Sequence, residues 1–585
     1  MRMRWLVNRT NAEYLTYLSK AASISPVFAQ VLINRGIKTL SDIHDFLHPS
    51  LTGLSDPFDL HGMKEAIERI KTARQLGQKV LVHGDYDADG LTATAITVSA
   101  LRTAGLDAGY FIPHRMFHGY GFNAAGVEAA QKAGARLIIT VDCGIGSFEA
   151  ADRARELGID VIITDHHEPT QKKGARGKGQ EAGGSEQDLI EFEVPKAVAV
   201  INPKCSPQTS DLAILSGAGI AFKLAQAMAA DSELRISHDD LFPLLDLAAL
   251  GTVADVVPLL GENRIMIRDA MPYIQSGSRR GLQALKQAAG LDGRQIKAGL
   301  LSYTLVPRIN AAGRIAEAHD VVRLLLSEEE HEAYELAAWL DRMNGERQRV
   351  EETVFQGALA QLKGSDTEAV IVLAHKTWHQ GVLGIVASKL AEAFHLPAFI
   401  FSLEDGIAKG SARSIPAFDI CRGLGQCRDL LISFGGHKQA AGVKLRASDL
   451  PAFEQRMKEI FRRDTAGEET EPVMEIHAPV KLAEVNSALM KELEMLEPLG
   501  YGNPEPLFGA KNLEVIGPKI VGSRHLKMKM KNGPFSLDAI GFDMGGLIDD
   551  LIPSAPYDAA FTPAYNEWNG GRYLQLLLKG LRPSP

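Results

Sequence analysis

Short apolar runs alternate with helix-patterned segments from about residue 56 to residue 260. The runs KVLVHG (79–84), RLIITVD (136–142) and DVIITD (160–165) are uninterrupted and rich in β-branched residues, which is typical of buried strands. The segments 91–105 and 148–158 repeat their apolar residues with a helical period. Strands that alternate with helices in this way predict a parallel, doubly wound sheet.

The rest of the chain divides into regions with other patterns. A long charged stretch at 326–365 predicts a connector helix, although Gly345 weakens this prediction locally. A second α/β unit begins at AVIVLAH (369–375), and the last part of the chain holds five strand candidates that suit a small OB-like barrel. We therefore expect an α/β multidomain protein. It should have five regions: an N-terminal helical segment (1–55), a parallel-sheet domain (56–325), the connector helix (326–365), the second α/β domain (366–465) and the barrel (473–585).

Composition changes this picture only modestly. Acidic residues outnumber basic ones by 72 to 63, which argues mildly against nucleic-acid binding because phosphates are neutralised by Lys and Arg. An acidic metal centre or a local basic channel is compatible with the same average. The four cysteines form no CxxC pair, so neither a zinc ribbon nor a disulfide framework is indicated. Together with the lack of a signal peptide or membrane-spanning run, this predicts a cytoplasmic protein.

One segment departs from the compact α/β pattern. Residues 170–190 are rich in Gly, Lys and Glu and have no apolar period. We expect them to form a flexible surface insertion.

Acidic and imidazole side chains follow the three apolar runs at the point where each predicted strand ends. They come in HGDYDADG after the first run, in VDCGIG after the second and in TDHHE after the third, and LAALGTVADVVPL (247–259) adds one more Asp in an apolar context. The carboxyl ends of parallel strands meet where ligand crevices open. So many acidic groups would raise one another's pKa values unless cations neutralise them, and mixed Asp and His ligands favour Mn²⁺ or Mg²⁺. Taken singly, each Asp could instead be an ordinary cap or turn residue.

These segments resemble the four motifs of the DHH phosphoesterase family. The matching residues are His83, Asp87 and Asp89, then Asp142, then Asp165, His166 and His167, and finally Asp255. The resemblance implies two divalent cations, Mn²⁺ or Mg²⁺. One cation would be held by His83 and Asp87, the other by Asp89, His166 and Asp255, and Asp142 would bridge both.

The same resemblance implies roles close to the reacting phosphate. His167 would lie near the scissile phosphate. Asp165 and Asp85 would either contact the metal ligands, without binding a cation themselves, or lie near the phosphate. The predicted catalytic residues are accordingly Asp142, His167 and Asp165.

Further segments resemble the RecJ-type exonucleases within this family. They are FIPHRMFHGYGFN (111–123), PRINAAGRI (307–315), the charged connector helix, and the glycine-rich KGSARS and FGGHKQAAG, which are similar to a DHHA1 domain. A solvated loop or helix face would explain some of these charges equally well. The implied substrate-binding residues are His114, Arg115, Arg308, Asn310, Arg314, Arg347, Ser411, Arg413, Ser414, Gly435, Gly436 and His437.

The predicted barrel contains an alternating basic strand. In RHLKMKMKN, Lys527, Lys529 and Lys531 alternate with apolar residues, so the three lysines share one face. This face suits a phosphate backbone. An edge strand protected by lysines is an equal alternative.

The resemblance spans nearly the whole chain and implies a metal-dependent exodeoxyribonuclease. The expected activity is single-stranded-DNA-specific 5′-to-3′ exonuclease cleavage by a two-metal mechanism, in DNA repair and recombination. Single-stranded DNA is the expected partner, a single-strand-binding protein and a helicase are candidate partners, and the chain is expected to be monomeric and independent of membranes. The alternatives are a short-oligonucleotide or phosphoadenosine phosphodiesterase and a non-catalytic DNA-binding scaffold. Retention of all six predicted metal ligands favours catalysis.

Overall fold

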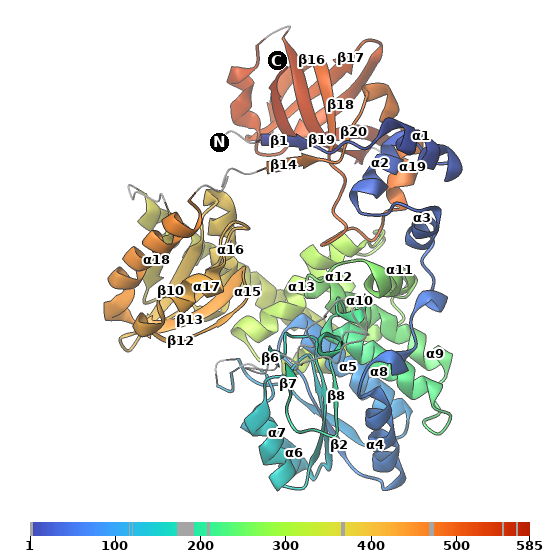
Figure 1. The fold of residues 1–585 in the computed structure, drawn as a ribbon, viewed down its shortest axis with the longest axis vertical. Helices are drawn as coiled ribbons and strands as arrows, with labels where there is room; N and C mark the ends of the chain where they lie inside the picture. Colours follow the sequence, from blue (N-terminus) through green and yellow to red (C-terminus); the bar gives the residue numbers. More distant parts are fainter. Residues whose placement is uncertain are drawn as a thin grey trace, which may run out of the picture. The chain divides into compact units, whose positions relative to one another are not determined.

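The computed structural model describes residues 4–115, 117–119, 121–171, 192–206, 211–363, 369–466, 473–552, 555–568 and 571–584. The chain folds into two compact units (Figure 1). One consists mainly of Pro307–Val321 and His331–Pro472, and the other of Arg4–Val306, Val322–Glu330 and Val473–Pro585.

The predicted parallel sheet is confirmed. Its five strands run parallel in the order β3-β2-β4-β5-β8, with bounds Ala108–Phe111, Val80–His83, Leu137–Val141, Asp160–Thr164 and Ala199–Ile201. β2 and β4 are buried along their whole length, as their continuous apolar runs predict. The crossover helices are α5, α6 and α7, at Ala88–Thr103, Ala124–Ala133 and Phe148–Glu156.

A group of buried helices follows the sheet in the chain. α8 packs against α5 and α10, and α10 packs against α11. Almost every residue of α10 is buried, which agrees with its apolar sequence. These helices are α8, α9, α10, α11 and α12, at Gly217–Ala230, His238–Leu241, Leu245–Ala254, Gly261–Ser276 and Arg280–Ala288, whereas α4 (Met63–Gln75) precedes the sheet.

A short hairpin lies at the predicted insertion. β6 (Thr170–Gln171) pairs with β7 (Phe192–Glu193) in antiparallel fashion. The predicted flexible insertion falls mostly on residues 172–191, which lie outside the part of the chain that the structure describes.

The predicted connector helix is present as α15 (Glu330–Leu362). Gly345 lies inside it without interrupting it, because a single glycine lowers helix stability only by about 1 kcal/mol relative to alanine. Two further helices precede it, α13 at Ala298–Ile315 and α14 at His319–Leu326.

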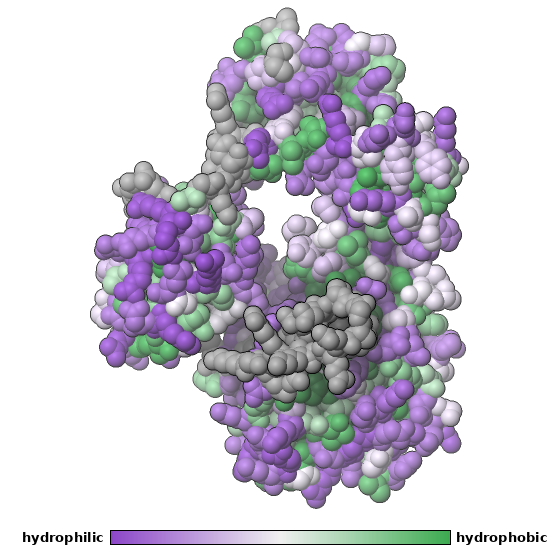
Figure 2. Space-filling view, viewed as in Figure 1, coloured by the Kyte–Doolittle hydropathy of each residue, from purple (hydrophilic) through white to green (hydrophobic). Residues whose placement is uncertain are grey.

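The second α/β domain contains a mixed sheet. Its order is β12-β13-β11-β10-β9, at Leu431–Gly436, Ala440–Arg446, Ile407–Arg413, Ala398–Glu404 and Ile371–His375. β9 and β10 are parallel, and the other neighbours are antiparallel. The visible face of this domain is mostly hydrophilic (Figure 2). Its helices are α16, α17 and α18, at Leu383–Phe394, Ile420–Gly425 and Leu450–Asp464.

The predicted OB-like barrel is also confirmed. The five expected strands form a sheet that closes through pairing of its first and fourth strands, β16 and β19. Trp568 pairs with Gly571 across the β19–β20 hairpin, and residues 569 and 570 lie outside the described residues. Strands β16, β17, β18, β19 and β20 are Phe508–Val521, His525–Asn532, Phe535–Gly541, Pro556–Trp568 and Gly571–Pro583; β15 (Ala478–Pro479) and α19 (Ser487–Glu494) precede them.

The N-terminal segment joins the barrel. The expected short helices are α1, α2 and α3, and Phe28 shares one apolar core with Phe508 and Phe561 of the barrel. The first residues form a strand that the sequence did not predict, β1 (Arg4–Val7), which pairs in parallel with β14 (Val473–Ile476). None of the described helices is long and apolar enough to cross a membrane. The bounds of α1, α2 and α3 are Ala12–Ala21, Pro26–Asn34 and Leu40–Leu47.

Candidate metal centre

The predicted metal ligands gather at the carboxyl ends of β2, β4 and β5. Asp87 is the N-cap of α5, and its carboxylate accepts the N–H groups of Asp89 and Gly90 at 3.0 and 3.1 Å. Asp142 follows β4 with a φ of 60°, a left-handed conformation that is costly for a residue other than glycine. Such strain persists where the surrounding structure needs the side chain in one place.

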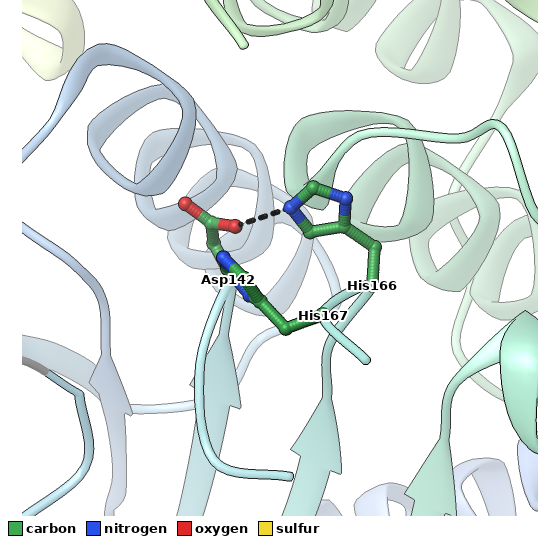
Figure 3. Close-up of side chains that lie close together, drawn as sticks. All are labelled: Asp142, His166 and His167. Atoms are coloured by element: carbon green, nitrogen blue, oxygen red, sulfur yellow. Dashed lines mark ion pairs between the residues drawn. The ribbon is translucent and has the colours of Figure 1, made fainter. Parts of the chain in front are cut away.

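His166 is at the centre of the cluster. Its Nε2 lies 3.0 Å from Asp142 Oδ1, 3.6 Å from Asp255 Oδ2 and 3.9 Å from Asp89 Oδ2. Figure 3 shows the imidazole directed at the Asp142 carboxylate, with His167 beside them. The four groups come from four elements that are distant in sequence, because Asp255 directly follows α10 and Asp89 lies in the first turn of α5.

Among the residues that the structure describes, three groups of His and Asp side chains have ligand atoms within 4.8 Å of one another. Asp89, His166 and Asp255 form one of them, which matches the set predicted for one cation. Asp142 belongs to both other groups, so its carboxylate lies close to two different sets of ligand atoms, and its bridging role stays a prediction. These two groups are Asp142, His166 and His167, and Asp85, Asp87 and Asp142.

His83 belongs to none of these groups of described residues, and Asp85 takes the place beside Asp87. The buried His83 ring packs edge-on against Phe122 and is tilted against Phe111, and Cys143 Sγ lies 3.7 Å from its Nδ1. Cys143 is itself buried, as expected for a packing residue. Ligation by His83 therefore remains a prediction.

Burial shapes the electrostatics of the cluster. Desolvation, reinforced by neighbouring carboxylates, raises the pKa of Asp89 to about 7 and that of Asp255 to about 8, and raises the pKa of Asp142 well above its usual range. Desolvation lowers the pKa of His83 to about 4 and that of His166 to about 3. The imidazoles of His83 and His166 are therefore neutral, and the neighbouring carboxylates disfavour one another's negative charge. Both effects are expected of a site that binds cations.

Buried polar atoms without hydrogen-bond partners provide an independent test for a cation. Asp85 Oδ1, Asp142 Oδ1, His83 Nε2 and His166 Nε2 are all buried and lack such partners. The His166 and Asp142 atoms face each other closely without the alignment of a hydrogen bond. Buried polar atoms are almost always satisfied, and oxygen and imidazole donors suit Mn²⁺ or Mg²⁺. The residues present fit divalent cations.

Asp165 has a different position from the ligands. Its carboxylate accepts the N–H groups of Ile145, His166 and His167 and faces His167 Nδ1 at 2.7 Å. Burial opposes protonation of His167, but the hydrogen bond and charge of Asp165 outweigh it and raise the pKa of His167 to about 9. Asp165 thus orients His167 and keeps it cationic, so this geometry favours a positioning role over a direct catalytic one.

Glycines around the ligands were not identified from the sequence. The start of α8 donates the N–H groups of Gly217 and Ala218 to the Asp89 carboxylate at 2.6 and 2.9 Å. A Cβ on Gly217 would lie 2.5 Å from Asp142 Cβ, and one on Gly251 would lie 2.5 Å from Asp89 Oδ1. The run Ser-Gly-Ala-Gly before an apolar helix was the available signal, since it combines an N-cap with small residues.

The predicted substrate residues of the first α/β domain lie beside the strand ends. Arg115 is exposed, and its guanidinium lies 5.3 Å from the centroid of the Tyr86 ring. The His114 N–H donates to His118 Nδ1 at 3.0 Å. Arg115 is therefore placed on the surface near the HGDYDADG segment.

The predicted arginines of α13 and α15 make specific contacts. Arg308 forms an ion pair with Asp341 at 2.9 Å, and Arg314 donates to the Gly381 carbonyl at 3.1 Å. Arg347 is largely buried and pairs with Glu351 at 2.7 Å. These contacts position the side chains; Asn310 lies between Arg308 and Arg314 in α13.

The predicted glycine-rich site of the second α/β domain is partly assembled. Arg413 donates to Ser411 Oγ at 3.2 Å, and a Cβ on Gly384, in the first turn of α16, would lie 3.1 Å from both side chains. This combination of a cation, a hydroxyl and a helix start suits an anion. Ser414 Oγ instead donates to the Phe418 carbonyl at 2.8 Å.

The GGH segment lies elsewhere in the same sheet, at the end of β12. Gly435 and Gly436 pair with Gly442 and Ala441, and the His437 N–H donates to the Ala440 carbonyl. Gly436 has a φ of 148°, and a Cβ there would lie 2.3 Å from the Ala440 oxygen. The glycine is therefore needed by the backbone itself.

The lysine strand has the predicted alternation. Leu526, Met528 and Met530 are buried, whereas the lysines point outward. However, β17 pairs with β16 on one side and β18 on the other, so the edge-strand alternative is wrong. Lys531 lies 3.0 Å from Glu514 and Lys529 lies 3.9 Å from Asp538, which offsets part of their charge.

Comparisons with known proteins agree with this architecture. The model described as "DHH family, N-terminal domain" matches residues 79–252, "DHHA1 domain" matches 367–463 and "RecJ OB domain" matches 476–580.

Relatives match over almost the full chain. The single-stranded-DNA-specific exonuclease RecJ of Bacillus subtilis is 36% identical over 99% of this chain and 70% of its own length. That of Dickeya dadantii is 35% identical over 96% of both chains. The crystal structure of RecJ from Thermus thermophilus with Mn²⁺ matches with a TM-score of 0.83 and 32% identity, over 100% of this chain and 80% of that chain. The structure with Mg²⁺ matches with a TM-score of 0.78 and 30% identity, over 100% of this chain and 79% of that chain. The chain belongs to the RecJ family of single-stranded-DNA-specific exonucleases.

Proposed function

We propose that this chain is a metal-dependent exonuclease that hydrolyses phosphodiester bonds of single-stranded DNA. The observation that carries the proposal is the convergence of Asp89, Asp142, His166 and Asp255, whose buried oxygen and nitrogen atoms face one another. The names of the relatives and the Mn²⁺ and Mg²⁺ complexes of similar structures support it.

Different residues of the site would bind the two cations and contact the phosphate. Asp89, His166 and Asp255 would hold one cation, His83 or Asp85 with Asp87 would hold the other, and Asp142 would contact both. When bound, two such cations activate a water molecule for attack and offset charge on the phosphate oxygens. His167, kept protonated by Asp165, would place a further positive group at the phosphate. No serine or cysteine nucleophile is required.

Several finer features extend the proposal. Cleavage in the 5′-to-3′ direction, a role in DNA repair and recombination, a cytoplasmic and monomeric protein, and cooperation with a single-strand-binding protein and a helicase are all proposed from the family resemblance. We also propose that Arg115, Arg413 and the β17 lysines contact the DNA, because all of them are positively charged. Arg115 is exposed, Arg413 lies beside the Ser411 hydroxyl, and the lysines point outward from the barrel.

The direct test uses strands labelled at the 5′ or 3′ end, in single-stranded and duplex form, with Mn²⁺, Mg²⁺ or a chelator. We expect progressive cleavage from the 5′ end of single strands only, abolished by the chelator. Cleavage confined to dinucleotides would favour the short-oligonucleotide phosphodiesterase instead. Binding without cleavage under every metal condition would favour the non-catalytic scaffold.

The Asp142→Ala variant separates catalysis from binding. Removing a group shared by both cation sites should reduce cleavage by at least about 100-fold, a scale typical of losing one group that stabilises transition-state charge. DNA affinity, measured by fluorescence anisotropy, should change little. Manganese-dependent turnover at the wild-type rate would contradict the bridging position of Asp142.

A further inference from the structure

A groove of about 860 Å³ lies at the end of α10, where the chain also carries the proposed ligand Asp255. Its lining includes Val253 and Val256, which flank the proposed ligand Asp255, and the aromatic side chains of Tyr303 and Tyr501. The volume is in the range of pockets that bind a small organic group. Every lining residue belongs to the same compact unit as the metal centre.

The apolar side chains of this groove are unusually exposed. Val256 is 63% exposed, Tyr303 86% and Tyr501 62%. The Tyr501 segment is nevertheless anchored, because the Tyr501 carbonyl accepts the Leu259 N–H at 2.8 Å and the buried Asn503 amide donates to two backbone carbonyls. The exposed ring of Tyr501 therefore extends from a backbone segment that is held in place by hydrogen bonds.

Val256 adds backbone strain to this exposure. It follows the C-cap of α10 with a φ of 58°, the left-handed position that helices usually fill with glycine. A β-branched residue is strongly disfavoured there. Because its side chain is mostly exposed, core packing does not compensate for the strain. A ligand contact provides a reason for valine at this position.

The charges of the groove favour an apolar, π-rich occupant. Lys297 is paired with Glu497 at 3.0 Å, and Glu505 adds a second carboxylate. An acidic edge disfavours the phosphates of a DNA strand, whereas aromatic rings stack on any nucleobase. Val256 directly follows the proposed ligand Asp255 in the chain, so one end of the groove lies a single residue from that ligand along the backbone.

We propose that this groove is a nucleobase subsite, in which Tyr303 and Tyr501 stack on bases of the single strand and Val256 contacts the base nearest the metal centre. The proposal rests on the proposed function, since it assigns how the same strand is held before cleavage. It predicts that binding depends on the bases at particular distances from the cleaved end.

The test uses a series of oligonucleotides, each lacking the base at one successive position from the degraded end. Their affinity for the full chain is measured with a chelator present, and their cleavage rate with Mn²⁺. For the wild-type chain, loss of the base at one or two positions should weaken binding by about 5- to 100-fold, as expected when a base–aromatic stack is removed. In Tyr303→Ala and Tyr501→Ala the intact strand should bind more weakly and the penalty at those positions should disappear.

Matched variants distinguish stacking from folding. Tyr303→Phe and Tyr501→Phe should keep the positional penalty, and so should Tyr17→Ala, which removes a tyrosine that is 59% exposed in α1. Val256→Gly relieves backbone strain, so its melting temperature should not fall while its DNA affinity does. If Tyr303→Ala or Tyr501→Ala fails to fold, Val256→Gly decides the question alone.

The outcomes also separate the two proposals. If the wild-type chain cleaves single strands but the positional penalties are absent, or are unchanged in the tyrosine and Val256 variants, the subsite is overturned and the nuclease stands. If the wild-type chain cleaves no strand with either metal, the proposed function itself fails.

Discussion

The Asp89 carboxylate illustrates how single residues of the metal centre are held. It accepts two backbone N–H groups from the start of α8, and the backbones of Gly217 and Gly251 approach the cluster so closely that a methyl group would clash. These contacts fix the ligand without using all of its lone pairs. The same logic holds for Asp165, which uses its oxygens to orient His167.

Gly251→Ala should therefore disturb the ligand Asp89 together with the packing of α10 on α5 and α8. The new Cβ would lie 2.5 Å from Asp89 Oδ1 and 2.4 Å from Ala218 Cβ, so the ligand must move. We expect Mn²⁺ affinity, measured by calorimetry, to fall about 10- to 100-fold, as for other groups that support metal ligands. Gly345→Ala is the matched control, because that helical glycine has open space and alanine should raise helix stability. Equal Mn²⁺ affinity in the two variants would refute this explanation.

The raised carboxylate pKa values predict a pH-dependent effect of metal on stability. Without metal, Asp89 and Asp255 have pKa values of about 7 and about 8, against about 3.9 in an unfolded chain. Between these values the folded state binds more protons, so its free energy of unfolding falls as the pH rises. Bound cations replace those protons. The rise in melting temperature caused by Mn²⁺ should thus be larger at pH 8 than at pH 5, and a pH-independent rise would contradict the assignment.

At the scale of elements, β17 shows how register decides which charges are available. Lys531 and Lys529 have carboxylate neighbours, whereas Lys527 pairs in register with Lys519 of β16. Like charges opposite each other in a sheet are unfavourable without an anion between them. Lys527 and Lys519 therefore form the part of this face best suited to a phosphate.

We expect the three lysines of β17 to contribute unequally to DNA binding. Removing one lysine–phosphate interaction reduces the slope of log affinity against log salt by about 0.7 for a single strand. Lys527→Ala should reduce the slope by about this amount, and Lys531→Ala should have a smaller effect because Glu514 already pairs with it. Binding titrations over a range of salt concentrations measure the slopes. If the slope is unchanged in a variant lacking all three lysines, the barrel does not bind the DNA through this face.

At the scale of the whole molecule, Arg264 links distant parts of the larger unit. This arginine of α11 is 1% exposed and donates to the carbonyls of Phe46, Met495 and Leu496. It thus ties the N-terminal helices and the chain leading to the barrel to the helices that follow the metal centre. The planar fork of arginine is what allows three bonds in different directions.

Arg264→Lys should weaken this connection. Lysine cannot reproduce the fork, and each buried carbonyl left without a donor costs about 1–3 kcal/mol. We expect a lower melting temperature and faster proteolytic release of the C-terminal region. Arg136→Lys, at an exposed arginine, provides the control. An unchanged protease pattern would show that the shared apolar core of Phe28 and Phe508 suffices.

Local periodicity and motif spacing were enough to predict the parallel sheet, the connector helix, the barrel strands and the acidic strand ends. Side-chain alternation and apolar runs depend on neighbours a few residues apart, which a sequence displays directly. The same reasoning placed the Asp and His residues that follow β2, β4 and β5 at one edge of the sheet, because parallel strands bring their carboxyl ends together. Asp255, which ends α10, was assigned to the site only through the family resemblance.

Tertiary structure alone decided the features that depend on distant partners. The pairing of β1 with β14, the approach of Gly217 and Gly251 to the ligands and the grouping of Asp85 with Asp142 all join segments far apart in the chain, and so does the pairing that places β17 inside its sheet. No local period encodes which distant segments meet, because that choice minimises the free energy of the packed whole.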